Sequence, residues 1–267
     1  MPPGAVDLPL ESAHHYGPRV HLVEDPWGAT ALARIGAADV SHTELLALVR
    51  SVYAHLCRTA LARELATVEK HVPTRMAATH PLAGLWRGTV LDPAQRVVVV
   101  DVIRGGIVPA QVCFEELSRL LPLDALRLDH LNMARIAGAD GHVARVDLSG
   151  SKVGGSIAGA TVVVPDPMGA TGSTTRLALD HLRERHGEPA KWVLLPMIAT
   201  PEYLRAVLAH DPRVAVWTAR IDRGLSPPDV LAAAPGRYWA RERGLDDHDY
   251  IVPGAGGVGE VLNNSWC

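Results

Sequence analysis

The chain has 267 residues, 48% of them hydrophobic, and carries 26 Lys and Arg against 29 Asp and Glu, a formal net charge of -3. This length supports one large domain with a substantial core, and the slightly acidic balance excludes a nucleic-acid binder that works through bulk positive charge. Because no apolar run reaches the length of a membrane span and the N-terminus lacks a signal pattern, we expect a cytoplasmic protein without a membrane partner.

The N-terminal part is expected to contain a loose arm and then one long helix. Residues 1–19 are rich in Pro, His and Gly and are expected to form the arm, with residues 20–267 as a single domain. The run Ser-His-Thr-Glu at 41–44 is a capping-box pattern, and apolar residues follow it at helical spacing past Arg63. The segment 71–95 contains three prolines and is expected to be irregular.

From Arg96 onward, apolar runs alternate with helical patterns. Strands are expected at 96–102, 125–131, 162–164, 192–195 and 214–218, and helices at 108–121, from the loop after 164 to about 186, and at 201–209. This alternation predicts an α/β fold, a mostly parallel sheet flanked by helices on both faces. Ligands of such sheets bind outside the carboxyl ends of the strands, where Arg104 and Asp166 are expected to lie.

The segment 162–175 combines a buried strand, an acidic residue, a loop of small residues and a helix start. Backbone amides of the loop and the positive end of the helix dipole can hold a phosphate group. Asp166, at the end of the strand, is placed to accept hydrogen bonds from sugar hydroxyls. The segment lacks the Gly-Lys-Ser/Thr ending of a P-loop, which leaves an ordinary strand-to-helix turn as the alternative.

Two glycine-containing segments interrupt or end the pattern. Glycines flank a short alternating run, 142–148, which indicates a mobile hairpin within 136–161; a surface loop without a role is the alternative. The glycines at 254–259 superficially match a dinucleotide-binding motif, but only eight residues follow Gly259, too few for the helix and strand that such a motif needs. We expect them instead to let a backbone approach a flat base closely.

The cysteines and histidines do not indicate a metal site. Cys57, Cys113 and Cys267 have no metal-ligand spacing, and their odd number argues against a disulfide framework. Cys57 and Cys113 fall within helical patterns and are expected to be core thiols. The thirteen histidines include no His-x-x-x-His pair followed by a carboxylate, so no metal held by the protein alone is expected.

Several of these segments resemble uracil phosphoribosyltransferases, which belong to the type I phosphoribosyltransferases. Asp166–Gly172 reads Asp-Pro-Met-Gly-Ala-Thr-Gly and resembles the family loop that binds phosphoribosyl diphosphate (PRPP). Val102–Ile107 resembles the diphosphate-contacting loop, and Tyr250–Gly256 resembles the uracil-binding segment Tyr-Ile-x-Pro-Gly-Leu-Gly. Segments 198–202 and 221–225 match two further family patterns, so the chain is identified as a divergent member.

The resemblance implies transfer of a 5-phosphoribosyl group from PRPP to a nitrogen heterocycle, most directly uracil, giving UMP and diphosphate. It implies Mg²⁺ bound through the diphosphate, PRPP and a base as partners, no nucleic-acid partner, and a homodimer or larger homo-oligomer. The catalytic residues that it implies are Arg104, Asp166 and Arg135. The PRPP-binding residues that it implies are these three with Pro167, Met168, Gly169, Ala170, Thr171, Gly172, Ser173 and Thr174. The implied base-binding residues are Tyr250, Ile251, Gly256, Gly257 and Val258.

The chain also departs from the family pattern. Gly257 stands where the family has an acidic side chain that meets PRPP, Val261 replaces an Arg, and Ile136 replaces the acidic residue after the hairpin Arg. An insertion at 226–245 precedes the base segment and is expected to contribute side chains to the base site. These departures leave two alternatives open, a phosphoribosyltransferase for another specialised heterocycle and a non-catalytic nucleotide-binding regulator.

Overall fold

The computed structural model describes residues 11–137, 143–147 and 150–265, with the backbone alone described at 134–137 and 143–147. The first half contains β1 (Val20–Leu22), α1 (Pro26–Ile35), α2 (His42–Glu64), β2 (Thr67–Pro73), the 3-10 helix η1 (Arg75–Ala78), β3 (Leu85–Leu91), β4 (Val97–Ile103), α3 (Ile107–Ser118) and β5 (Leu126–Asn132). The second half contains β6 (Ala134–Ala137), β7 (Val143–Asp147), β8 (Thr161–Gly169), α4 (Ser173–His186), β9 (Lys191–Ala199), α5 (Pro201–His210), β10 (Val214–Thr218), β11 (Arg220–Ile221), α6 (Pro228–Leu231), the 3-10 helix η2 (Trp239–Arg241) and α7 (Val258–Asn263).

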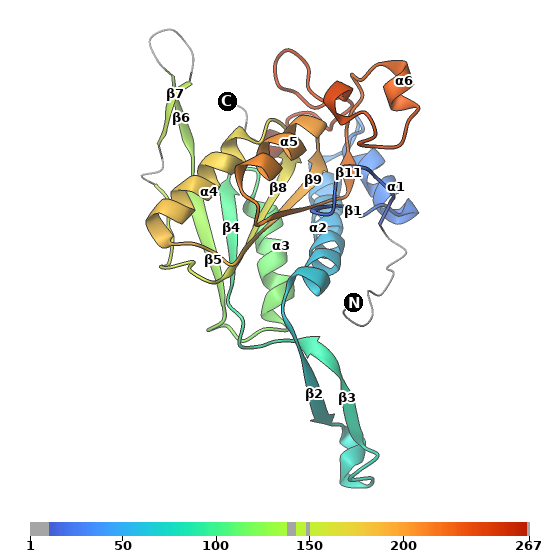
Figure 1. Ribbon diagram of the computed structural model, residues 1–267, viewed down its shortest axis with the longest axis vertical. Coiled ribbons are helices and arrows are strands. Elements are labelled where there is room, and N and C mark those ends of the chain that lie inside the picture. Colours follow the sequence, from blue (N-terminus) through green and yellow to red (C-terminus); the bar gives the residue numbers. More distant parts are fainter. Residues whose placement is uncertain (1–10, 138–142, 148–149, 266–267) are drawn as a thin grey trace.

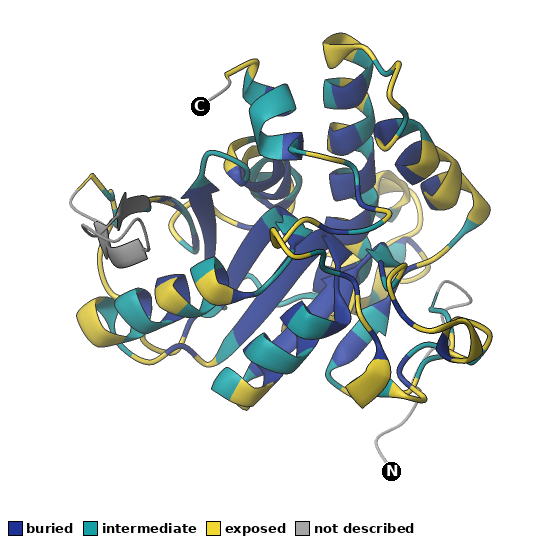
Figure 2. Cartoon of the chain, turned by 90° about the horizontal axis from the view of Figure 1, so that it is seen from above, coloured by how far each residue is buried: buried dark blue, intermediate teal, exposed yellow. Residues whose placement is uncertain are grey.

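The centre of the molecule is a 7-stranded sheet with the order β1-β10-β9-β8-β4-β5, in which β11 pairs with β9. All of its strand pairs are parallel. Seen from above, the buried strands run between helices on both sides (Figure 2). The expected α/β fold with a mostly parallel sheet is therefore confirmed.

Both faces of the sheet are buried because its strands are rich in valine, and alternate side chains enter different cores. In β4, Val97 and Val99 join the core under α1, α2 and α3. Val98, Val100 and Val102 join the core under α4 and α5. Strands that are apolar on both faces are typical of parallel sheets covered by helices.

The topology changes direction between β4 and β8. From β4 the chain passes through α3 to β5 on one side, whereas β8 begins a series that builds the sheet outward on the other side (Figure 1). β4 pairs with β8 only from Val97↔Thr161 to Val99↔Val163. Beyond that point the two strands separate, which opens a crevice at their carboxyl ends, the place where such sheets bind ligands.

An antiparallel arm projects from the body between α2 and β4 (Figure 1). It consists of β2 and β3, paired from Thr67↔Leu91 to Pro73↔Leu85. The expectation of an irregular segment at 71–95 was therefore wrong. Every residue of β2 is exposed, so the arm lacks the alternation of buried and exposed residues by which a strand is recognised in a sequence.

The insertion 226–245 packs against the N-terminal segment. Glu242 is 1% exposed; it accepts a hydrogen bond from the Tyr16 hydroxyl at 2.6 Å and lies 3.1 Å from Nη1 of Arg223. The Tyr16 ring meets Trp239 edge-on, with the ring centroids 5.2 Å apart. The chain from Glu11 onward is thus held against the body, although it was expected to belong to a loose arm.

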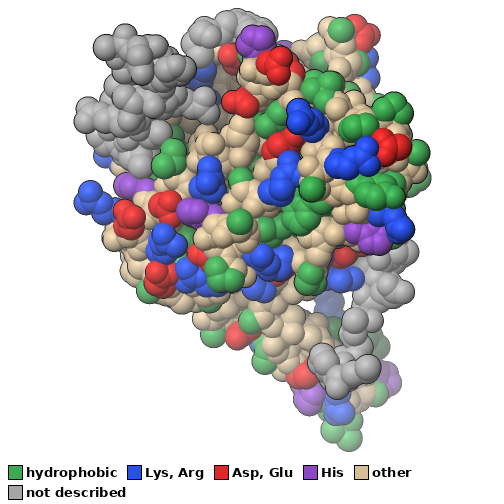
Figure 3. All heavy atoms as spheres, turned by 45° about the horizontal axis from the view of Figure 1, so that its top comes forward, with side chains coloured by type: hydrophobic (Ala, Val, Ile, Leu, Met, Phe, Trp, Pro, Cys, Tyr) green, Lys and Arg blue, Asp and Glu red, His purple; other side chains and the backbone are tan. Residues whose placement is uncertain are grey.

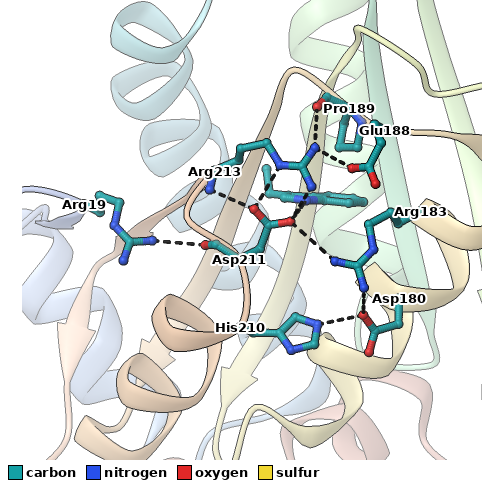
Figure 4. Close-up of polar contacts among 9 residues, drawn as sticks. Arg19, Asp180, Arg183, Glu188, Pro189, His210, Asp211 and Arg213 are labelled. Atoms are coloured by element: carbon teal, nitrogen blue, oxygen red, sulfur yellow. Dashed lines mark hydrogen bonds and ion pairs between the residues drawn. The ribbon is translucent and has the colours of Figure 1, made fainter.

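A polar network joins α4, α5 and β10 at the amino ends of the central strands, at the end of the sheet opposite to the crevice (Figure 4). Asp211 accepts hydrogen bonds from Nε and Nη2 of Arg213, at 3.0 and 2.7 Å, and from the indole nitrogen of Trp192. The Arg213 contacts lower the pKa of Asp211 to about 2. This network lies at the amino ends of β9 and β10, away from the crevice, and its role is structural.

Helix α2 is the one helix, among the described residues, whose length and mean hydropathy of 1.2 would allow it to cross a membrane. Its inner side chains, including Val49, Tyr53 and Leu56, are fully buried in the core. Cys57 of α2 and Cys113 of α3 are buried free thiols, as expected, whereas Cys267 lies outside the described residues.

Candidate functional site

A cavity of about 580 Å³ opens at the crevice between β4 and β8. Five segments of the chain contribute to its wall. It is lined by Ile103, Arg104, Gly105, Met133, Asp166, Pro167, Met168, Ala170, Thr174, Asp249, Tyr250, Ile251, Gly256, Gly257, Val258, Gly259 and Glu260. Segments that are distant in the sequence, resembling the diphosphate loop, the PRPP loop and the base segment, thus meet in one cavity.

Arg104 follows β4 directly, and the peptide bond from Ile103 is cis. The chain then turns tightly into α3 at Gly106, where an added Cβ would lie 2.8 Å from the Val102 nitrogen and 2.9 Å from Oδ1 of Asp101. Only glycine fits this turn. Nη1 of Arg104 donates to the Ser265 hydroxyl at 2.8 Å, so the guanidinium meets the C-terminal segment above the cavity.

Asp166 lies beside the loop that follows β4. Its Oδ1 lies 3.6 Å from the position that a Cβ on Gly105 would take, and accepts a weak hydrogen bond from the Met168 amide at 3.3 Å. Burial, with a smaller contribution from the charge of Asp101, raises the pKa of Asp166 to about 6. Although the residue keeps some exposed surface, its carboxyl lies deep and has few donors, which leaves it able to accept hydrogen bonds from a ligand.

The loop after β8 forms a cradle at the N-terminus of α4. Gly172 has φ +76° and caps the helix without a side-chain hydrogen bond, so the first amides of α4 face the loop. The Thr200 hydroxyl donates to the Ala170 carbonyl at 2.7 Å and holds the loop from β9. The Ser173 amide donates to the Thr171 hydroxyl at 3.2 Å. Amides at a helix N-terminus with small side chains around them are able to bind an anion.

The base segment is held from below by a pair of residues that sequence reasoning did not single out. Asp222 accepts a hydrogen bond from the Gly254 amide at 2.8 Å, and Arg220 donates to the Gly254 carbonyl at 2.9 Å. Arg220 and Asp222 also pair with each other. Because the pair fixes both backbone groups of Gly254, it positions the turn that presents Ile251 and Gly256. In the sequence, the resemblance of segment 221–225 to a family pattern was the signal that could have indicated this pair.

The cavity brings together most of the expected site residues. Gly169 at the end of β8, Thr171 and Gly172 in the loop, and Ser173 at the start of α4 adjoin the cavity without being on its wall. The backbone of Arg135 lies in β6, which pairs with β7 as the expected hairpin, but its side chain falls outside what the structure describes. Met133, Asp249 and Glu260 line the cavity and were not anticipated.

The expectation for the insertion was wrong. Among the described residues, none from 226–245 lines the cavity, although the insertion ends just before the base segment in sequence. Glu242 and Trp239 of the insertion contact Tyr16 of the N-terminal segment instead.

The described residues contain no group of three or more His, Cys, Asp or Glu side chains that could hold a metal ion. The cavity does contain the separate carboxylates of Asp166, Asp249 and Glu260. Mg²⁺ prefers oxygen ligands and is commonly bound through one or two carboxylates together with substrate phosphates. The residues therefore fit an ion that arrives with a phosphorylated substrate, not one held by the protein alone.

Comparisons with known proteins point to the same chemistry. The family model described as uracil phosphoribosyltransferase matches residues 23–236. A uracil phosphoribosyltransferase of Myxococcus xanthus is 29% identical over 245 residues, which cover 92% of this chain and 97% of that protein. One of Caldanaerobacter subterraneus is 27% identical over 73% of each chain. The solved structure of a protein from Aquifex aeolicus matches with a TM-score of 0.67 and 22% identity, covering 91% of this chain and 97% of that one.

Proposed function

Because the chain belongs to the uracil phosphoribosyltransferase family, we propose that its β4–β8 cavity transfers the 5-phosphoribosyl group of PRPP to uracil, giving UMP and diphosphate. The chain is a pentosyltransferase of this family. The observation that carries the proposal is the meeting of an arginine, an anion cradle and a glycine-rich base segment in one cavity.

In this proposal, the loop 169–174 and the first amides of α4 bind the 5′-phosphate. Asp166 accepts hydrogen bonds from the ribose hydroxyls, and Arg104 binds the diphosphate and neutralises the charge that develops as it leaves. Arg135 would approach the diphosphate from the hairpin. The transferred sugar becomes cation-like in the transition state, so catalysis requires positioning and electrostatic stabilisation without a covalent bond to the protein.

The base would lie against the backbone of Ile251, Gly256, Gly257 and Val258, beneath Tyr250. Ile251 is 8% exposed and Val258 is buried, whereas the Tyr250 side chain is 57% exposed. Close approach of the backbone lets N–H and C=O groups read the edge of a flat ring. The amide edge of uracil offers both donors and acceptors to such a backbone.

Mg²⁺ would enter with PRPP and supply positive charge at the leaving diphosphate. The carboxylate of Asp166, on the cavity wall, would be able to meet an ion bound there. A cytoplasmic location follows from the same family membership and is part of this proposal.

The two alternatives have different support. Another heterocycle is favoured by Gly257, by Asp249 on the cavity wall and by the altered residues that follow the base segment. A regulator that binds nucleic acid would need a basic face. On the face seen in Figure 3, Lys and Arg side chains are interspersed with Asp and Glu and do not form a continuous field, which gives that alternative little support.

We also propose that the active form is at least a homodimer and that the β2–β3 arm packs on a second copy of the chain. An isolated two-stranded hairpin is marginally stable in water, so an arm whose side chains face solvent needs a partner. Trp86 is 45%, Met76 56% and Leu82 84% exposed. These apolar side chains belong to the β2–β3 arm, which projects away from the body of the chain and is not covered by it (Figure 1).

Turnover of PRPP with a panel of bases tests the proposal. We expect uracil, in the presence of Mg²⁺, to yield UMP and diphosphate, detected by chromatography.

Arg104→Ala should lower turnover far more than it lowers base binding. Product from another heterocycle, with none from uracil, would keep the phosphoribosyl transfer and remove the assignment to uracil; binding of PRPP without any product would favour the regulator.

A further inference from the structure

Glu260 lines the cavity but has no direct role in the transfer so far described. It is the third residue of α7 and is partly buried. Within the part of the chain that the structure describes, its carboxylate has neither a hydrogen-bond nor an ion-pair partner. A carboxylate held inside a ligand cavity without a protein partner is available to a ligand.

The side chain of Glu260 folds back over Gly257. A Cβ built on Gly257 would lie 2.6 Å from Oε2 and 3.4 Å from Cδ of Glu260, and its three nearest atoms all belong to that residue. The carboxylate therefore stands in the space that a side chain at position 257 would enter. This is also the position at which the family pattern has an acidic residue and this chain has glycine.

Helix α7, which carries Glu260, packs against the loop that follows β4. An added Cβ on Gly259 would lie 3.5 Å from Cα of Gly105, so the first turn of α7 covers the loop that follows Arg104. Asn263, at the end of α7, donates to the Arg104 carbonyl at 3.5 Å. Glu260, Arg104 and Asp166 all line this one cavity.

A carboxylate beside a bound diphosphate repels it unless a cation lies between them. Mg²⁺ keeps several water ligands and is typically held by one or two carboxylates together with substrate phosphates. Resting on the function proposed above, we infer that Glu260 takes over the acidic role vacated at position 257 and binds the Mg²⁺ carried by the diphosphate of PRPP, directly or through its water ligands. Glu260 is then a PRPP-positioning residue.

The test measures PRPP affinity by isothermal titration calorimetry over a series of Mg²⁺ concentrations, using the full chain. Glu260→Gln removes the charge and keeps the shape. The double variant Gly257→Asp with Glu260→Ala returns a carboxylate from position 257, where φ of -77° accepts any residue. Glu184→Gln, on the exposed surface of α4, is the matched control for a lost negative charge.

At saturating Mg²⁺ we expect Glu260→Gln to bind PRPP about 10-fold more weakly than the unchanged protein, because a hydrogen bond to a charged group is lost. Without Mg²⁺ Glu260→Gln should bind PRPP at least as tightly as the unchanged protein, because the repulsion between the carboxylate and the diphosphate is removed. The double variant should recover most of the affinity, and Glu184→Gln should lose none.

Equal affinity of Glu260→Gln and the unchanged protein at saturating Mg²⁺ would overturn the inference, while PRPP binding itself would leave the proposed function standing. A loss of the same size with and without Mg²⁺ would also overturn it and point to a ribose hydroxyl. Failure of the unchanged protein to bind PRPP would overturn the proposed function and this inference together.

Discussion

Gly172 and Ser173 determine how the proposed phosphate cradle can be tested. A bulky residue at Gly172 is a poor probe, because its φ of +76° strains any β-branched side chain and the Cβ would lie 3.1 Å from that of Ala206. Loss of binding in such a variant would not separate a damaged fold from a damaged site.

Ser173→Asp is the sharper variant. Ser173 is exposed and is the first residue of α4, where an acidic side chain is favourable for the helix. The same negative charge should repel the 5′-phosphate and weaken PRPP binding by about 100-fold or more in calorimetry. Ser173→Ala serves as the control and should bind nearly as well as the unchanged protein. Full PRPP affinity in the folded Asp variant would move the phosphate site elsewhere.

Asp166 is expected to lower the free energy of unfolding of this protein at neutral pH. Its pKa is about 6 in the folded protein against 3.8 in a solvated Asp. The unfolded chain therefore ionises first as the pH rises, and the penalty to the folded state grows from about pH 4 to about pH 6 and is constant above. Asp166→Asn should be more stable by up to about 3 kcal/mol at neutral pH, with no gain near pH 3, in denaturant unfolding.

Asp211→Asn provides the opposite case. The Arg213 contacts lower the pKa of Asp211 to about 2, so its contribution is present above 3.8 and is lost as the pH falls toward 2. This variant should lose stability at neutral pH. A loss of stability in both variants at neutral pH would contradict the effect expected for Asp166.

At the scale of single residues, the sequence predicted the side chains that adjoin a motif and missed those that reach the site from elsewhere. Arg104, Asp166 and Ile251 stand within patterns that can be read locally. Glu260 reaches the cavity because the short helix α7 turns back over it. The Arg220–Asp222 pair acts by holding the backbone of Gly254, which is distant in sequence, and contacts of this kind form only when the chain has folded.

The arm formed by β2 and β3 allows a direct test of the proposed assembly of two copies. Trp86 lies opposite Val72 in the pairing of the two strands, and both are exposed. Trp86→Glu should place a charge in the proposed interface between two copies and shift the protein to the mass of a single chain in sedimentation velocity.

Trp27→Glu is the matched control, because Trp27 is 52% exposed on α1, in the body of the molecule. It should leave the mass of the assembly unchanged. An unaltered assembly in Trp86→Glu would show that the arm does not join the copies.

At the scale of elements, the alternating region after Arg96 was predicted because burial in the chain's own core imposes a pattern on the sequence. The arm escaped prediction because its strands have no core of their own to face. α1 was also missed, although Asp25 followed by Pro26 is a recognisable helix start: Asp25 accepts hydrogen bonds from the amides of Trp27 and Gly28.

For the whole molecule, PRPP with Mg²⁺ should raise the unfolding temperature. A ligand at 100 times its dissociation constant stabilises the folded state by about 2.7 kcal/mol. For a chain of this size that corresponds to roughly 5–10 °C in a thermal scan. Ser173→Asp should show almost no shift at the same PRPP concentration, and an equal shift in that variant would indicate that PRPP binds outside the cradle.

The fold class and the position of the cavity could be predicted from the sequence because alternating strands and helices indicate a parallel sheet, and such sheets bind ligands at the carboxyl ends of their strands. The place of the insertion could not. Proximity in sequence suggested that 226–245 faces the base, whereas Glu242 instead pairs with Arg223 and meets Tyr16, a partner more than 200 residues away. Long-range partners of this kind leave no local pattern.

The early separation of β4 from β8 has a consequence for redesign. Since the crevice is a product of how the strands diverge, its location does not depend on which side chains decorate it. A protein engineer who seeks a different acceptor can therefore leave the phosphate cradle, both strands and α7 untouched and vary only Asp249 and Tyr250. In this scaffold, different walls of the cavity bind the phosphoribosyl group and select the base. The base selectivity could therefore be changed at one wall without altering the other.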